Sequence, residues 1–122
     1  MILGMHYLID IYDCKVDKLK SVNQIKNIMV ATAKIGKLKV VSKNFHQFRP
    51  YGVSGVLVLK ESHFSIHTWP EYNYASIDLY LCDLSINIDK IISFLKIQFN
   101  STNIIIQKIE RGNIKTDNLI YS

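Results

Sequence analysis

Residues 38–82 contain four short apolar runs that are separated by only a few turn-forming residues. The runs cover residues 38–48, 53–59, 63–69 and 74–82, and each is bounded by Gly, Pro, Asn or a polar pair. Connections this short can join antiparallel neighbours, whereas parallel strands need a crossover of a dozen or more residues. The spacing therefore predicts a largely antiparallel sheet.

Helical patterns stand on either side of these runs. Residues 18–35 have helical spacing, with Asp17 expected to cap the first turn and Gly36 to end the helix. The stripe of this helix consists of Leu19, Val22, Ile25, Ile28, Met29 and Thr32. A second helix is predicted over 88–99, and strands over 5–12 and 103–109. This order predicts an α+β fold, a two-layer α/β sandwich with a mainly antiparallel sheet and helices packed on one face.

Composition indicates one soluble domain over residues 1–122. The chain is 48% hydrophobic and 20% charged, and its net charge of +5 is dispersed, which predicts a solvated basic face and no nucleic-acid partner. No apolar run approaches the roughly 18 to 20 residues that cross a bilayer, and the start lacks the plan of a signal peptide, so we expect no membrane association and a cytoplasmic location. Cys14 and Cys82 lack zinc-site spacing and are expected to be free thiols, and we expect no required metal.

Residues 61–71 concentrate imidazole, hydroxyl and carboxylate groups in the sequence Glu-Ser-His-Phe-Ser-Ile-His-Thr-Trp-Pro-Glu. A second block, Pro-Tyr-Gly-Val-Ser-Gly, covers residues 50–55. A single serine, cysteine or histidine in a strand is usually a packing residue, and Trp69 is expected in the core. The concentration of reactive groups instead indicates a functional site.

Antiparallel pairing converts these positions into geometry. A turn at residues 70–73 sets Ser62 beside Leu81 and Cys82, and a turn at residues 60–62 sets Ser54 opposite His67. The sequence therefore predicts two clusters, one of Ser62 with Cys82 and one of Ser54 with His67.

The two motif blocks and Cys82 closely resemble the bacterial and archaeal S-adenosylmethionine decarboxylase proenzymes, over about residues 4–112. The resemblance implies a proenzyme that cleaves itself between Glu61 and Ser62, giving residues 1–61 and 62–122, and that makes a pyruvoyl cofactor from Ser62. It implies decarboxylation of S-adenosyl-L-methionine to the aminopropyl donor for spermidine biosynthesis. It assigns the catalytic proton donor to Cys82.

The same resemblance implies a nucleoside site. Phe48 would stack on the adenine, and Glu71 would accept hydrogen bonds from the ribose hydroxyls. Taken without the resemblance, Phe48 also suits the core and Glu71 also suits a solvated turn.

The residue types suit this chemistry. A serine hydroxyl in a constrained turn can attack the preceding carbonyl and form an ester through an oxyanion, for which Ser54 can supply a donor. His67 can accept the α-proton of the esterified Ser62, and β-elimination then leaves dehydroalanine. Hydrolysis yields the pyruvoyl ketone, which forms a Schiff base with a substrate amine. His63 is given only a supporting role.

The distance between Ser62 and His67 predicts an active site that is shared between the two subunits of a homodimer. Five strand residues at about 3.3 Å separate Ser62 from His67 by roughly 16 Å, beyond hydrogen-bond reach. A two-fold interface can place Ser54 and His67 of one subunit against Ser62 and Cys82 of the other.

Asp83 departs from the family pattern, in which glycine commonly follows the cysteine. Substrate preference therefore stays open at this point. One alternative is a pyruvoyl-dependent arginine or ornithine decarboxylase, and a second is a non-catalytic regulatory family member.

Overall fold

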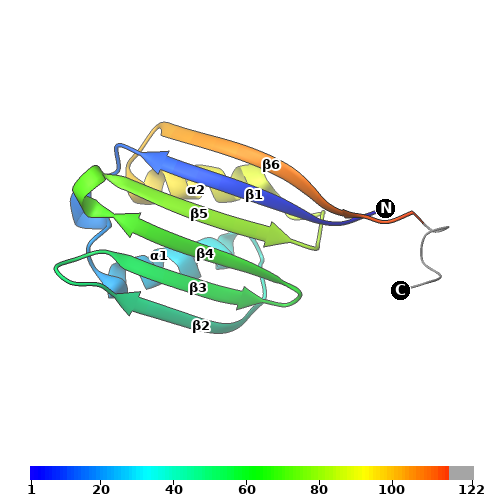
Figure 1. Cartoon of the computed structure of the whole chain (residues 1–122), viewed down its shortest axis with the longest axis horizontal. Coiled ribbons are helices and arrows are strands. Elements are labelled where there is room, and N and C mark those ends of the chain that lie inside the picture. Colours follow the sequence, from blue (N-terminus) through cyan, green and yellow to red (C-terminus); the bar gives the residue numbers. More distant parts are fainter. Residues whose placement is uncertain (116–122) are drawn as a thin grey trace.

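Six antiparallel strands form one sheet, and two helices cover one of its faces (Figure 1). The computed structural model describes residues 1–115. The strands are β1 (Ile2–Tyr12), β2 (Val40–Gln47), β3 (Val53–Leu59), β4 (Ser62–Trp69), β5 (Tyr74–Leu81) and β6 (Asn103–Asn113), and the helices are α1 (Val22–Ile35) and α2 (Ile88–Phe99). Two short 3-10 helices are η1 (Val16–Lys18) and η2 (Pro70–Tyr72). The strand order is β2-β3-β4-β5-β1-β6, which confirms the predicted α+β sandwich.

The start of the first helix was predicted wrongly. Asp17 lies in η1, and α1 begins at Val22 after Ser21, whose side chain accepts a hydrogen bond from the backbone N–H of Gln24. A serine hydroxyl in extended backbone is an efficient N-cap, so the helix starts one turn later than the apolar stripe suggests. Leu19 is nevertheless buried, because η1 leads it into the core.

The outer strands are longer than predicted. β1 begins at Ile2 and β6 extends to Asn113, and these two residues are paired with each other. Such pairing joins opposite ends of the chain, so no local pattern shows where it stops.

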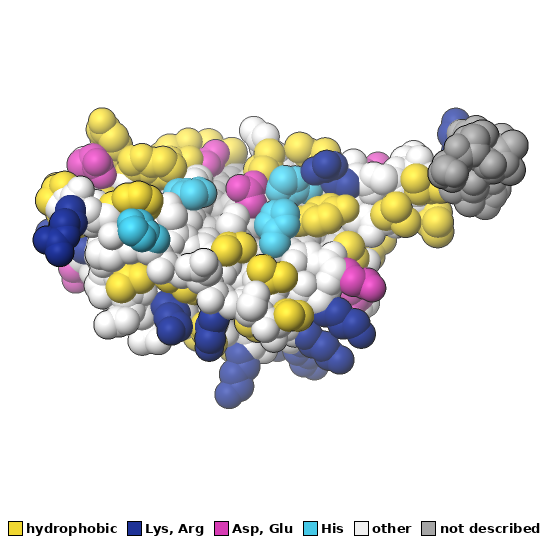
Figure 2. All heavy atoms as spheres, turned by 60° about the horizontal axis from the view of Figure 1, so that its bottom comes forward, with side chains coloured by type: hydrophobic (Ala, Val, Ile, Leu, Met, Phe, Trp, Pro, Cys, Tyr) yellow, Lys and Arg dark blue, Asp and Glu magenta, His cyan; other side chains and the backbone are white. Residues whose placement is uncertain are grey.

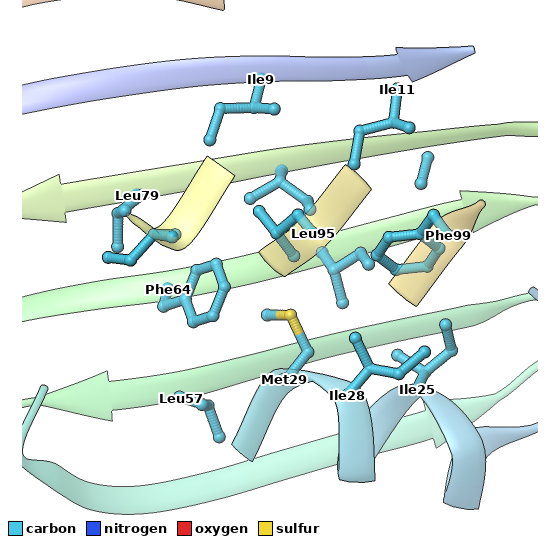
Figure 3. Close-up of a cluster of buried hydrophobic side chains, with 14 of the residues drawn as sticks. Ile9, Ile11, Ile25, Ile28, Met29, Leu57, Phe64, Leu79, Leu95 and Phe99 are labelled. Atoms are coloured by element: carbon cyan, nitrogen blue, oxygen red, sulfur yellow. The ribbon is translucent and has the colours of Figure 1, made fainter. Parts of the chain in front are cut away.

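The core lies between the sheet and the helices. Figure 3 shows Phe64 and Leu79 of the sheet facing Met29 of α1 and Leu95 and Phe99 of α2. All of these side chains are fully buried. Burying an apolar side chain of this size contributes about 1.5 to 3 kcal/mol, so the helices are held mainly by this layer.

The other face of the sheet, called the open face below, is covered by no helix of residues 1–115. Burial along β4 alternates, with Phe64 and Ile66 buried and His67 and Trp69 exposed on the open face. Trp69 is 37% exposed, so its predicted place in the core was wrong. No helix among residues 1–115 is long and apolar enough to span a membrane.

Candidate active site

The β3–β4 hairpin presents the Glu61–Ser62 bond at a tight turn. Glu61 has a φ of 63°, which is the left-handed region that L-residues other than glycine rarely occupy. Ser62 begins β4 opposite Leu59, and its Oγ donates a hydrogen bond to the Lys60 carbonyl at 3.4 Å. The hydroxyl of Ser62 therefore lies beside the backbone of the turn that precedes it.

Cys82 contacts the same turn from the end of β5. Its Sγ donates a hydrogen bond to the carbonyl oxygen of Glu61 at 2.7 Å. The register pairs His63 with Tyr80, so Ser62 and Cys82 are neighbours as predicted. The hydrogen bond from Cys82 to the Glu61 carbonyl was not predicted. Strand register gives the positions of residues but not the direction of each side chain.

A hollow of about 430 Å³ opens at this turn. Its lining consists of Lys37, Leu38, Lys39, Leu59, Lys60, Glu61, Ser62, Leu81, Cys82, Asp83 and Ile86. The carboxylate of Asp83 accepts hydrogen bonds from the backbone N–H and the hydroxyl of Ser85, and these bonds lower its pKa. Asp83, which departs from the family pattern, therefore makes its hydrogen bonds within its own loop.

The second predicted cluster lies toward the other end of β4. Ser54 and His67 are cross-strand partners, and Ser54 Oγ lies 2.7 Å from His67 Nδ1. A hollow of about 300 Å³ beside them is lined by Phe48, Tyr51, Gly52, Ser54, His67, Thr68, Trp69 and Glu71. Phe48 is 47% exposed, so it is not a core residue. The structure thus brings Phe48 and Glu71 to the hollow that contains Ser54 and His67.

Within one chain, the two clusters remain apart. β4 runs from Ser62 to Trp69 without a shift in register against either neighbour, so about 16 Å separates Ser62 from His67. Alternation along the strand also places Ser62 on the side of the buried Phe64, and His67 on the open face.

Sequence reasoning missed a third group, on the open face. His6 is the cross-strand neighbour of Tyr80, which pairs on its other side with His63. His6 Nε2 lies 3.1 Å from Asp78 Oδ1, and Arg111 lies 3.3 Å from His6 Nδ1. Figure 2 shows histidine side chains, in cyan, exposed on the face of the molecule that it displays. Only pairing between distant segments of the chain creates this group.

The two cysteines are free, as expected, and differ in environment. Cys14 is buried, and its Sγ donates a hydrogen bond to the Ile11 carbonyl. Burial, assisted by the charge of Asp13, raises the pKa of Cys14 to about 11. Cys82 is partly exposed. Among residues 1–115, no group of three or more His, Cys, Asp or Glu side chains could hold a metal ion.

Comparison with known proteins identifies the family. A family model described as S-adenosylmethionine decarboxylase matches residues 5–112. A Thermosipho melanesiensis protein named S-adenosylmethionine decarboxylase proenzyme is 41% identical over 110 residues, which cover 90% of this chain and 85% of that protein. A Thermodesulfovibrio yellowstonii protein of the same name is 48% identical over 80 residues, which cover 66% of this chain and 59% of that protein.

A solved structure agrees with these sequence matches. The crystal structure of the adenosylmethionine decarboxylase from Aquifex aeolicus superposes with a TM-score of 0.86 at 34% identity, and the match covers 94% of this chain and 95% of that chain. With a family model that spans most of its length and relatives above 30% identity, the chain belongs to the S-adenosylmethionine decarboxylase family.

Proposed function

We propose that this chain is a proenzyme that cleaves itself between Glu61 and Ser62 and then decarboxylates S-adenosyl-L-methionine. One observation carries the proposal. The Cys82 thiol donates a hydrogen bond to the carbonyl that Ser62 would attack, in a turn whose Glu61 is held in a rare backbone conformation. Cleavage would give fragments of residues 1–61 and 62–122.

The first step converts the amide to an ester. Ser62 Oγ forms a bond to the carbonyl carbon of Glu61, the bond from that carbon to the Ser62 nitrogen breaks, and the hydroxyl proton moves to the nitrogen. Negative charge develops on the Glu61 oxygen, where the Cys82 S–H already donates. Strain at Glu61 is released when the peptide bond breaks.

The second step uses the other cluster. His67 accepts the α-proton of the esterified Ser62, the bond from Cβ to the ester oxygen breaks, and the first fragment leaves with a carboxylate at Glu61. The hydrogen bond between Ser54 Oγ and His67 Nδ1 fixes the orientation of the His67 ring. Tautomerisation of the dehydroalanine and hydrolysis of the imine then release ammonia.

A pyruvoyl group at position 62 fits this site, because residue 62 is a serine that starts a strand beside a hollow of about 430 Å³. The group supplies an electron sink for decarboxylation. Cys82 supplies a proton to the carbon that has lost carbon dioxide. Phe48 binds the adenine by stacking, and the Glu71 carboxylate accepts hydrogen bonds from the ribose hydroxyls.

A homodimer with shared sites resolves the separation between the clusters. Ser54 and His67 of one subunit serve Ser62 and Cys82 of the other, across an isologous interface. The open face supports this arrangement, because it exposes apolar side chains that no helix covers. These include Val58, Trp69, Ile105 and Ile109.

The relatives described above are named for S-adenosylmethionine, which supports this substrate over arginine or ornithine. A non-catalytic role is also not favoured, since Ser62, His67 and Cys82 are all present. The proposed product serves as the aminopropyl donor for spermidine synthesis.

The proposal is tested by intact mass under denaturing conditions. The wild-type chain should give two fragments, the second beginning with a ketone at position 62, and Ser62→Ala should stay whole. The cleaved protein should then release carbon dioxide from S-adenosylmethionine and not from arginine or ornithine. A wild-type chain that stays whole after long incubation would refute self-processing.

A further inference from the structure

Gln47 makes an unusual set of hydrogen bonds for a side chain at the end of an edge strand. It is the last residue of β2, directly before Phe48. Its Oε1 accepts from the Val22 N–H at 2.8 Å, and its Nε2 donates to the Lys20 carbonyl at 2.8 Å and the Gly52 carbonyl at 3.0 Å. A weaker bond from Nε2 reaches the Phe48 carbonyl at 3.3 Å. One amide thus joins the start of α1 to both ends of the loop over residues 48–52.

The 48–52 loop forms one wall of the hollow beside His67. Phe48, Tyr51 and Gly52 all line that hollow. The backbone N–H of Phe48 donates to the Gly52 carbonyl at 2.8 Å, which closes the loop on itself. The Lys20 ammonium lies 5.3 Å from the centre of the Tyr51 ring, a second link between the loop and the segment before α1.

Thr68 fixes the strand that follows the loop. Its hydroxyl donates to the Leu19 carbonyl at 2.9 Å and accepts from the Val53 N–H at 2.9 Å. The start of β3 is therefore held independently of Gln47, whereas the hydrogen bonds that tie the Phe48 end of the loop to the start of α1 come from the Gln47 side chain.

We propose that Gln47 is a positioning residue that sets the substrate affinity of this site by holding the 48–52 loop, and with it Phe48, against the start of α1. The inference rests on the proposed function, because it takes Phe48 as the contact with the adenine. Without the amide, the Lys20 and Gly52 carbonyls lose a donor and the loop samples other conformations. Apparent affinity falls in proportion to the fraction of loops that remain competent to bind.

Gln47 touches none of Ser62, Cys82 and His67. Its loss should therefore leave the rate of chain cleavage and the turnover of bound substrate unchanged. This separation distinguishes positioning of the nucleoside from a general loss of structure.

The test uses Gln47→Met, which keeps the length of the side chain without its hydrogen bonds, and Gln47→Glu, which keeps the acceptor and removes the donors. Gln98→Glu, in the groove between α1 and α2, is the matched control for an added carboxylate. Processed Gln47→Met enzyme should show KM for S-adenosylmethionine raised about tenfold with kcat within about twofold, as expected if about a tenth of the loops stay competent. Gln47→Glu should show a larger rise, because its carboxylate faces carbonyl oxygens.

Hydrogen exchange of the unliganded proteins adds a readout that needs no activity. The amide of Phe48 should exchange faster in both Gln47 variants than in wild type or Gln98→Glu. The amide of Val22 should exchange faster in Gln47→Met, which has lost the acceptor for its N–H. Unchanged KM, or a fall in kcat equal to the change in KM, would overturn the inference. A wild-type chain that never cleaves would refute the proposed function instead, and unchanged exchange would then by itself overturn the role of Gln47 in holding the loop.

Discussion

At the residue scale, the two cysteines differ in burial. Burial raises the pKa of Cys14 to about 11, and the nearby charge of Asp13 acts in the same direction. A raised pKa keeps the group as the neutral thiol at pH 8, and only the thiolate reacts with alkylating agents. Iodoacetamide at pH 8 should therefore label the partly exposed Cys82 and spare Cys14, as measured by peptide mass. In guanidinium chloride both should be labelled, and labelling of folded Cys14 as fast as Cys82 would contradict the assigned burial.

Cys82 also allows a kinetic prediction. Its thiol donates to the Glu61 carbonyl, where charge develops during ester formation. Removing one such donor costs about 10²–10³ in rate at sites of this kind. Cys82→Ala should cleave slower by about that factor, and Cys82→Ser should retain part of the rate because a hydroxyl also donates. The cleavage rate can be measured by gel electrophoresis or mass spectrometry, as the fraction of uncleaved chain that remains over time. Equal rates in wild type and Cys82→Ala would show that this hydrogen bond does not serve processing.

The site residues illustrate how far sequence reaches at this scale. Ser54 opposite His67 could be predicted, because the turn at residues 60–62 fixes the register of one hairpin. The third group, with His6 and Asp78, could not be predicted, because it depends on the pairing of β1 with β5 across most of the chain. Local turn chemistry is readable from sequence, whereas long-range pairing needs the folded chain.

At the element scale, the bounds of β3 and α2 were predicted correctly. Turn residues flank β3, and Asn87 caps α2. The predicted start of α1 was wrong because Ser21, four residues after the predicted cap Asp17, also carries a side chain that can cap a helix. The apolar periodicity does not show at which of these two residues the helix begins. In the structure, η1 carries Leu19 into the core before α1 begins.

Gly55 gives a prediction about the edge of the sheet. Gly55 of β3 pairs with Phe45 of β2, and a Cβ built at position 55 would lie 2.0 Å from Cδ1 of the Phe45 ring. Gly55→Ala should force the ring away and lower the free energy of unfolding by about 1 to 3 kcal/mol, the usual cost of overpacking. Denaturant unfolding measures the change.

A double-mutant cycle with Phe45→Ala tests whether the Phe45 ring causes the destabilisation. In a Phe45→Ala background the ring is absent, so adding Gly55→Ala should cost little. The same cost in both backgrounds would mean that the ring of Phe45 is not the cause.

At the scale of the whole molecule, the sheet separates the two clusters that the proposed chemistry needs together. Ser62 lies at the hairpin end of β4, and His67 lies near the other end on the open face. No helix in the described part of the chain covers this face, and Trp69 and Ile105 are exposed on it. If two copies stacked their open faces about a two-fold axis, the apolar surface would be covered. The Ser62 end of β4 in one copy would then lie against the His67 end of β4 in the other.

Mixed dimers test this arrangement directly. Ser62→Ala removes the attacking hydroxyl, and His67→Ala removes the base, so each variant alone should remain uncleaved. When the two are co-expressed with different tags and the mixed dimer is purified, one site should combine the intact Ser62 of the His67→Ala chain with the intact His67 of its partner. That chain should then be cleaved, and about half of the wild-type sites per dimer should become active. If each site were built within one subunit, every site would lack a residue and both chains would stay whole, because intact groups in different subunits could not meet.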